Sequence, residues 1–154
     1  MHFIWNLKVL VERRKSKMKE LEQRLIDKQI NPTAMRLVVL DFLLGQSSAQ
    51  SLTDMELKMV RTDRVTLYRT IRTFEENGIV HRIEDGSGIT KFALCAAGCD
   101  VEGHHDLHLH FYCTVCKQTH CLPKTIIPEI SLPEGYQSLE TQLMVRGICR
   151  DCGI

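Results

Sequence analysis

The sequence predicts an α+β fold, and three observations lead to it. Apolar residues recur at helical spacing over much of residues 7–76. Two β-prone runs follow, joined by the Gly-rich segment 85–88, as in a hairpin. The C-terminal part carries two Cys-x-x-Cys motifs, at 113–116 and 149–152. We therefore expect a helical module that ends in a hairpin, followed by a metal-binding module.

Composition sets limits on the class of protein. With 154 residues, 44% of them hydrophobic, the chain can bury one medium core or two small ones. No apolar run is long enough to span a bilayer, and the N-terminal run lacks the basic start and cleavage site of a signal peptide. We expect a cytoplasmic protein without a membrane partner. Residues 1–17 are interpreted as a non-native start, with Met18 opening the working protein.

Charge is distributed unevenly along the chain. Residues 1–89 carry 15 Lys and Arg against 12 Asp and Glu, whereas residues 90–154 carry 5 against 7. The difference favours two modules, of which the first is mildly basic. The first predicted helix, 7–29, contains the basic run 13–19, which fits either a phosphate contact or a solvated helix face.

Capping residues divide the helical module. Asn31 is expected to cap a largely apolar helix that has Pro32 at its first position and ends at Gly45. Thr53 and Glu56 fit a capping box that opens a short helix to about residue 60.

The next helix, residues 64–77, is predicted to begin after Asp63 and to have two faces. Its apolar side is expected to consist of Val65, Leu67, Ile71 and Phe74. Its cationic and aromatic side carries Arg64, Tyr68, Arg69 and Arg72. Tyr68 fits either this exposed side or packing against the core. Two short helices, a tight turn and a basic second helix indicate a helix-turn-helix.

The two β-prone runs, 79–84 and 89–95, add a wing to this motif. We therefore place a winged-helix DNA-binding module at 1–94, a hinge at 95–103 and a zinc-binding module at 104–154.

The zinc-binding module begins with alternation between polar and apolar residues. Residues 104, 106, 108 and 110 fall on one face of a predicted strand, and three of them are histidines. A hairpin turn at 113–116 should return through Thr119 to Leu122, and residues 138–149 are predicted to form a last strand.

The two Cys-x-x-Cys motifs predict a closed tetrahedral zinc site made by Cys113, Cys116, Cys149 and Cys152. A single such motif would also fit redox chemistry, and isolated cysteines would fit burial in a core. Two matched pairs favour structural Zn(II).

Five sequence blocks resemble the ferric uptake regulator family of bacterial metal sensors. They are N-P-T-A-x-R (31–36), D-R-V-T-L-Y-R-T-I (63–71), F-E-E-N-G-I-V-H-R (74–82), H-x-H-x-x-C-x-x-C (108–116) and C-x-x-C (149–152). The resemblance implies a homodimer with an N-terminal winged helix and a C-terminal α/β dimerisation domain, which represses transcription when a regulatory metal is bound. It also implies DNA contacts by Tyr68 and Arg69, with Arg64 and Thr66 nearby. Arg72, on the same cationic face, is a further candidate for DNA contact.

The resemblance further implies a regulatory metal site, but the ligands depart from those of iron-sensing members. Gln50 and Ala93 stand where those members carry His and Glu, and Leu107 and Leu109 remove a third site. The candidates here are His81, Cys95, His108, His110 and Cys121. His81 and Cys95 match the zinc uptake regulator branch. Because imidazole and thiolate suit Zn(II) better than Fe(II), zinc is the expected effector and Fe(II) the alternative.

We therefore expect a zinc-responsive repressor of metal-uptake genes that binds a double-stranded operator as a dimer. An iron- or peroxide-responsive regulator of the same family is the alternative. A zinc enzyme is more distant, because the deaminase pattern requires H-x-E and P-C-x-x-C, and Tyr112 precedes Cys113. A metal-storage protein would leave the helix-turn-helix unexplained. Neither catalysis nor a small-molecule substrate is expected.

Overall fold

The computed structural model describes residues 2–59, 62–95, 108–123, 125, 127–128, 130–138 and 141–153, with the side chains of residue 9 and of residues from 11 onward. Most of the predicted hinge, with Cys99, lies outside the described residues. So do His104, His105, Asp106 and Leu107, which belong to the predicted ligand-bearing strand.

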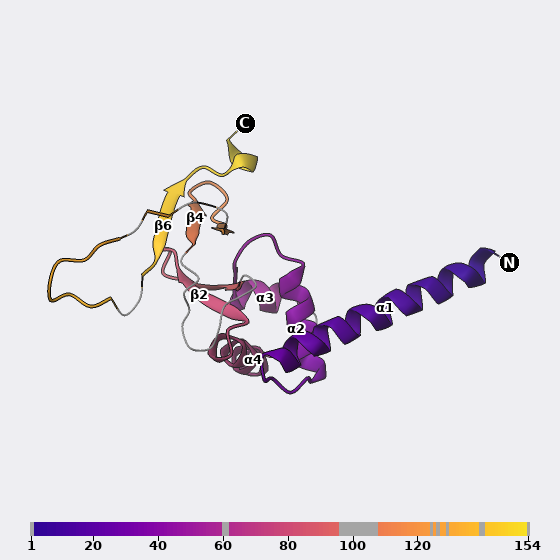
Figure 1. Cartoon of the computed structure of the whole chain (residues 1–154). Helices are drawn as coiled ribbons and strands as arrows, with labels where there is room; N and C mark the ends of the chain where they lie inside the picture. The colour runs from indigo at the N-terminus through magenta and orange to yellow at the C-terminus, as the bar shows by residue number, and fades with distance from the viewer. Residues whose placement is uncertain are drawn as a thin grey trace.

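The N-terminal module is a bundle of four helices that covers a small sheet (Figure 1). The strands of this sheet lie in the order β1-β3-β2, and β2 and β3 form the predicted wing hairpin. The elements are α1 (His2–Asp27), α2 (Ala34–Leu44), β1 (Gln50–Ser51), α3 (Leu52–Lys58), α4 (Arg64–Glu76), β2 (Val80–Glu84) and β3 (Thr90–Leu94). The two-residue strand β1 was not predicted.

One hydrophobic core unites these elements. Leu25 of α1, Leu40 of α2, Met55 of α3 and Phe74 of α4 are all fully buried in it. Leu21 and Leu25, in the second half of α1, reach the core, and the helix extends from there away from the bundle (Figure 1). The basic run 13–19 is exposed along this helix.

Two predicted helix starts are each wrong by two residues. Thr33, not Asn31, caps α2, because its backbone is extended and its hydroxyl accepts from the Arg36 amide. The capping box of α3 is Ser51 with Asp54, not Thr53 with Glu56. Pairing with β3 holds Ser51 extended, so the helix begins directly after it.

The C-terminal module is a second three-stranded sheet, in the order β5-β4-β6. Strands β4 (Leu109–Cys113) and β5 (Thr119–Leu122) form the predicted antiparallel hairpin. Strand β6 (Leu143–Gly147) is shorter than predicted and runs parallel to β4. A 3-10 turn, η1 (Arg150–Cys152), follows it. Helices and sheets together form the expected α+β architecture.

Candidate metal centres and nucleic-acid interface

The two Cys-x-x-Cys motifs meet at one end of the C-terminal sheet. Cys113 ends β4 and Cys116 lies in the following turn, whereas Cys149 and Cys152 border and end η1. The parallel pairing of β4 with β6 brings Cys113 opposite Gly147, so both motifs lie at the same end of the sheet. The four sulfur atoms all lie within 4.8 Å of one another.

The geometry and donor chemistry of this four-cysteine cluster fit Zn(II). A tetrahedron with metal–sulfur bonds of about 2.3 Å has edges of about 3.8 Å. The Sγ atoms of Cys116 and Cys149 are 3.8 Å apart. Four thiolates at this spacing can hold a structural metal ion in a closed, four-coordinate site.

The thiols of the cluster differ in acidity. Burial would raise the pKa of Cys113, but backbone N–H groups, first that of Cys149, lower it to about 6. Hydrogen bonding with Cys149 raises the pKa of Cys152 to about 12. Close packing of four acidic groups opposes their joint ionisation, and a bound cation removes that opposition.

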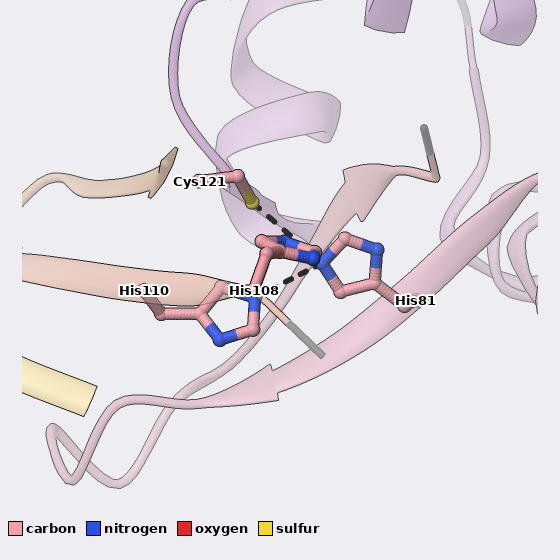
Figure 2. A group of neighbouring side chains, drawn as sticks. All are labelled: His81, His108, His110 and Cys121. Atoms are coloured by element: carbon pink, nitrogen blue, oxygen red, sulfur yellow. Dashed lines mark hydrogen bonds between the residues drawn. The ribbon is translucent and has the colours of Figure 1, made fainter. Parts of the chain in front are cut away.

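A second cluster lies between the two modules. His81 projects from β2, His108 immediately precedes β4, His110 lies in β4 and Cys121 lies in β5 (Figure 2). Their ligand atoms all lie within 4.8 Å of one another. His108 and His110 are each only 5% exposed, whereas His81 and Cys121 are half-buried.

Two distances in this His₃Cys cluster test its fit to a tetrahedral ion. The Nε2 atoms of His81 and His110 are 3.1 Å apart, and His81 Nε2 is 3.6 Å from Cys121 Sγ. Tetrahedral zinc with bonds of about 2.05 Å to nitrogen and about 2.3 Å to sulfur requires edges of about 3.3 and about 3.6 Å. The donors of the cluster and these two spacings therefore fit Zn(II).

Cys95 stands apart from these four residues. Its sulfur lies 3.6 Å from Nδ1 of His81, the ring nitrogen opposite the one that faces His110 and Cys121. Gln50, predicted to stand in place of the His of iron-sensing members, is 3% exposed and accepts a hydrogen bond from Lys58. The structure thus brings together four of the five predicted candidates.

Helix α4 presents the predicted cationic face to solvent. Tyr68 is 46% exposed, which argues against packing in the core, while Leu67, Ile71 and Phe74 are buried. Arg64 and Arg72 are exposed and pair with Glu56 and Glu76, and Arg69 is exposed as well. Thr66, in the first turn, is partly buried.

The prediction that Val65 belongs to the core is wrong. Val65 is 60% exposed, because it precedes Leu67 by two residues and therefore lies about 200° around the helix from it. The helical phase of Leu67, Ile71 and Phe74 could have shown this. An exposed apolar side chain beside Tyr68 suits contact with a thymine methyl group.

A winged helix followed by a sheet with two potential metal centres defines a class of metal-binding, DNA-binding regulators. A sequence model of the Ferric uptake regulator family matches residues 27–145, and this chain belongs to that family. Members of this family are metal-responsive transcription regulators. A sequence search of curated proteins gives no match.

Solved structures share this fold at low sequence identity. A zinc uptake regulator complexed with zinc and DNA has a TM-score of 0.60 and 18% identity, covering 90% of this chain and 93% of its own. Holo XcZur also has a TM-score of 0.60 and 18% identity, covering 89% of this chain and 96% of its own. The Vibrio cholerae ferric uptake regulator has a TM-score of 0.57 and 20% identity, with coverage of 83% and 98%. Among the described residues, no helix has the length and apolar character needed to cross a membrane.

Proposed function

We propose that this protein is a zinc-responsive transcriptional repressor of metal-uptake genes, acting in the cytoplasm as a homodimer on double-stranded operator DNA. The observation that carries the proposal is the cluster of three imidazoles and one thiolate between the wing and the C-terminal sheet. Its candidate ligands come from both modules, so a bound ion would link the DNA-binding module to the C-terminal module.

The donor set is the reason for proposing zinc. Fe(II) and Mn(II) favour sites with oxygen ligands, whereas imidazole and thiolate suit Zn(II). Neither cluster found in the described part of the chain includes a carboxylate. The same feature disfavours a zinc hydrolase or deaminase, since such enzymes use a carboxylate as their base. We propose no catalytic activity.

The two centres have different roles in this proposal. Cys113, Cys116, Cys149 and Cys152 would hold a structural zinc that ties β6 and η1 to the β4–β5 turn. His81, His108, His110 and Cys121 would hold the regulatory zinc, with Cys95 as the remaining candidate beside His81. The fold shared with a zinc uptake regulator that was solved with zinc and DNA supports zinc as the ion.

The regulatory step follows from the position of the ligands. When bound, zinc supplies directional bonds that hold imidazole and thiolate ligands at fixed distances. His81 lies on the wing, whereas His108, His110 and Cys121 lie on the C-terminal sheet. In a dimer, the angle between wing and sheet sets the spacing of the two α4 helices. Helix-turn-helix dimers read half-sites about 34–36 Å apart, or a multiple of this.

The exposed face of α4 is the proposed reading surface. Tyr68 and Arg69 are the first candidates for base and backbone contacts, and Val65 adds an apolar contact. Arg64 and Arg72, paired with acidic side chains here, can exchange these partners for phosphates. Thr66 lies in the first turn of the same helix.

A metal-by-metal titration tests the proposal. Duplexes are first selected from a random library by the zinc-loaded protein, and affinity is then measured on protein that keeps its four-cysteine zinc. Zn(II) should raise the affinity about 5- to 150-fold, the usual range of coupling between two sites. An equal or larger response to Fe(II) would instead support the iron-sensing alternative, and no response to any metal would contradict regulation.

A further inference from the structure

Close to the His₃Cys cluster, a second contact joins the wing hairpin to the C-terminal sheet. Asp85, in the turn between β2 and β3, is 1% exposed, Lys91 of β3 is 7% exposed and Thr119 of β5 is fully buried. Lys91 Nζ lies 2.7 Å from Asp85 Oδ2, and the Thr119 hydroxyl donates to the same oxygen at 2.5 Å. Lys91 also donates to the Thr119 hydroxyl at 3.0 Å. The three groups form a closed triangle across the two modules.

Arg146 of β6 adds a fourth member. Its guanidinium donates to the backbone carbonyl of Asp85 at 2.7 Å. The neighbouring Gly86 has φ +76°, and a Cβ built there would lie 1.7 Å from Arg146 Nη2. Glycine at 86 therefore leaves the space that Arg146 needs. We call Asp85, Lys91, Thr119 and Arg146 the polar joint.

The polar joint uses the strands that also carry the metal ligands. Asp85 follows β2, which carries His81, and Thr119 begins β5, which carries Cys121. A backbone hydrogen bond of 2.8 Å from Ala49 N to Thr119 O strengthens the same junction, and Lys91 donates to Lys117 O at 2.8 Å. No member of the joint belongs to either metal cluster.

We propose that the polar joint consists of positioning residues that hold the wing on the C-terminal sheet without the help of a metal, so that His81 already faces His108, His110 and Cys121 when zinc arrives. The inference rests on the proposed function in one respect, the assignment of that cluster as the zinc site. The inference goes beyond the proposed function, because it names residues that set zinc affinity without contacting zinc.

The physical reason is preorganisation. A ligand that binds only one conformation has its apparent affinity reduced by the fraction of molecules in that conformation. The Asp85–Lys91 ion pair lies within the wing, and Thr119 and Arg146 bind it from the C-terminal sheet. A displaced wing would lose these hydrogen bonds to its charged pair, so the joint is specific in geometry. The joint therefore favours the arrangement in which the ligands from both modules converge.

The charge state of the joint fits this role at neutral pH. Burial would raise the pKa of Asp85, but hydrogen bonds from Lys91, Ser87 and Thr119 outweigh it and hold the pKa well below its usual range. The carboxylate is thus ionised over the range in which zinc ligands are deprotonated.

Two glycine variants provide a matched test. Gly86→Ala and Gly88→Ala place a side chain at nearly equal positive φ, +76° and +79°, so both carry similar backbone strain. Only the Cβ at 86 meets Arg146, because nothing lies within 4 Å of the one at 88. Thr119→Val and Thr119→Ser form a second pair, in which only the serine keeps the hydroxyl.

Two readouts are measured on protein that keeps its four-cysteine zinc. The first is the Zn(II) affinity of the His₃Cys cluster, measured by competition with a chromophoric chelator. The second is amide hydrogen exchange at Ala49 in protein whose His₃Cys cluster has been stripped of metal. Gly86→Ala and Thr119→Val should weaken zinc at least about fivefold relative to Gly88→Ala and Thr119→Ser, and should speed exchange at Ala49. Equal zinc affinities with unchanged exchange would overturn the proposal.

The readouts separate this inference from the proposed function. If zinc binding responds to the joint but no DNA is bound, the joint stands and the repressor proposal fails. If wild type takes up only one zinc per chain, the sensing site fails, and exchange at Ala49 still decides whether the joint holds the wing.

Discussion

His81 and His110 place their Nε2 atoms 3.1 Å apart, although one belongs to the wing and the other to the C-terminal sheet. The two rings are tilted at 42° with centroids 5.3 Å apart, so the nitrogens approach without stacking. Two imidazoles from separate modules can therefore share one ion, and occupancy of that ion would constrain how the modules are arranged.

The four-cysteine cluster should be needed for folding of the C-terminal module. Cys113→Ser removes a fully buried ligand, and structural zinc contributes about 10–16 kcal/mol of apparent folding free energy in small zinc domains. We expect loss of one zinc per chain and loss of cooperative unfolding of that module, measured by metal analysis and calorimetry. Cys95→Ser, outside the cluster, should keep this zinc. A folded Cys113→Ser dimer with unchanged stability would contradict the structural role.

Arg69 should contribute to DNA affinity without affecting stability. It is exposed on α4, next to the exposed Tyr68. If the side chain contacts a base, Arg69→Ala should weaken the free energy of DNA binding by about 1–3 kcal/mol. If it contacts phosphate, the variant should lower the slope of log affinity against log salt concentration by about one. Fluorescence anisotropy at several salt concentrations distinguishes the two. Arg150→Ala removes the same charge from η1 and should change neither value; equal losses in both variants would argue against α4 as the reading surface.

Leu25 should fix α1 to the helical core. It is fully buried, whereas its neighbour Ile26 is 54% exposed. Leu25→Ala should lower the free energy of unfolding by about 2–5 kcal/mol, and Ile26→Ala should change it far less. Urea denaturation measures both. A larger loss for Ile26→Ala would mean that the helix is rotated about its axis.

Asp85 should give the protein a stability component that is lost in acid. Its folded-state pKa is depressed, so its contribution is present above the ordinary carboxyl pKa of about 4 and declines as pH falls through and below that value. Asp85→Asn should lower the free energy of unfolding by about 2 kcal/mol at pH 7 and by progressively less in acid. Zinc release in acid affects both proteins, so the difference between their unfolding curves is the quantity to measure. A difference that does not shrink in acid would contradict an ionised Asp85.

Much of the fold could be predicted from the sequence because local patterns specify it. The phase of Leu67, Ile71 and Phe74 and the cap at Asp63 determine α4. The turn residues between β2 and β3 specify the wing, and the Cys-x-x-Cys motifs specify the cysteine cluster. The start of α3 was misplaced because a two-residue strand, too short to leave a pattern, holds Ser51 extended.

The contacts between modules could not be predicted from the sequence. Asp85 lies in a Gly-rich turn, where a carboxylate is ordinarily solvated, and its burial depends on Thr119 and Arg146 from strands far along the chain. For the same reason, the sequence could nominate five regulatory ligands but could not show which ones converge. From the sequence, Cys95 and Cys121 are equally plausible metal ligands. The arrangement of β2 against β5 distinguishes them, because it places Cys121 at Nε2 of His81 and Cys95 at Nδ1.

The most direct measurement compares zinc-dependent DNA affinity in wild type and in His81→Ala, both retaining the four-cysteine zinc. His81 is the ligand that the wing contributes to the four-residue cluster, so its loss should leave the fold and the structural zinc intact. Wild type should gain about 5- to 150-fold in affinity for the selected duplex when Zn(II) is added, and the variant should gain none. The same gain in His81→Ala would show that an ion bridging the two modules does not control DNA binding.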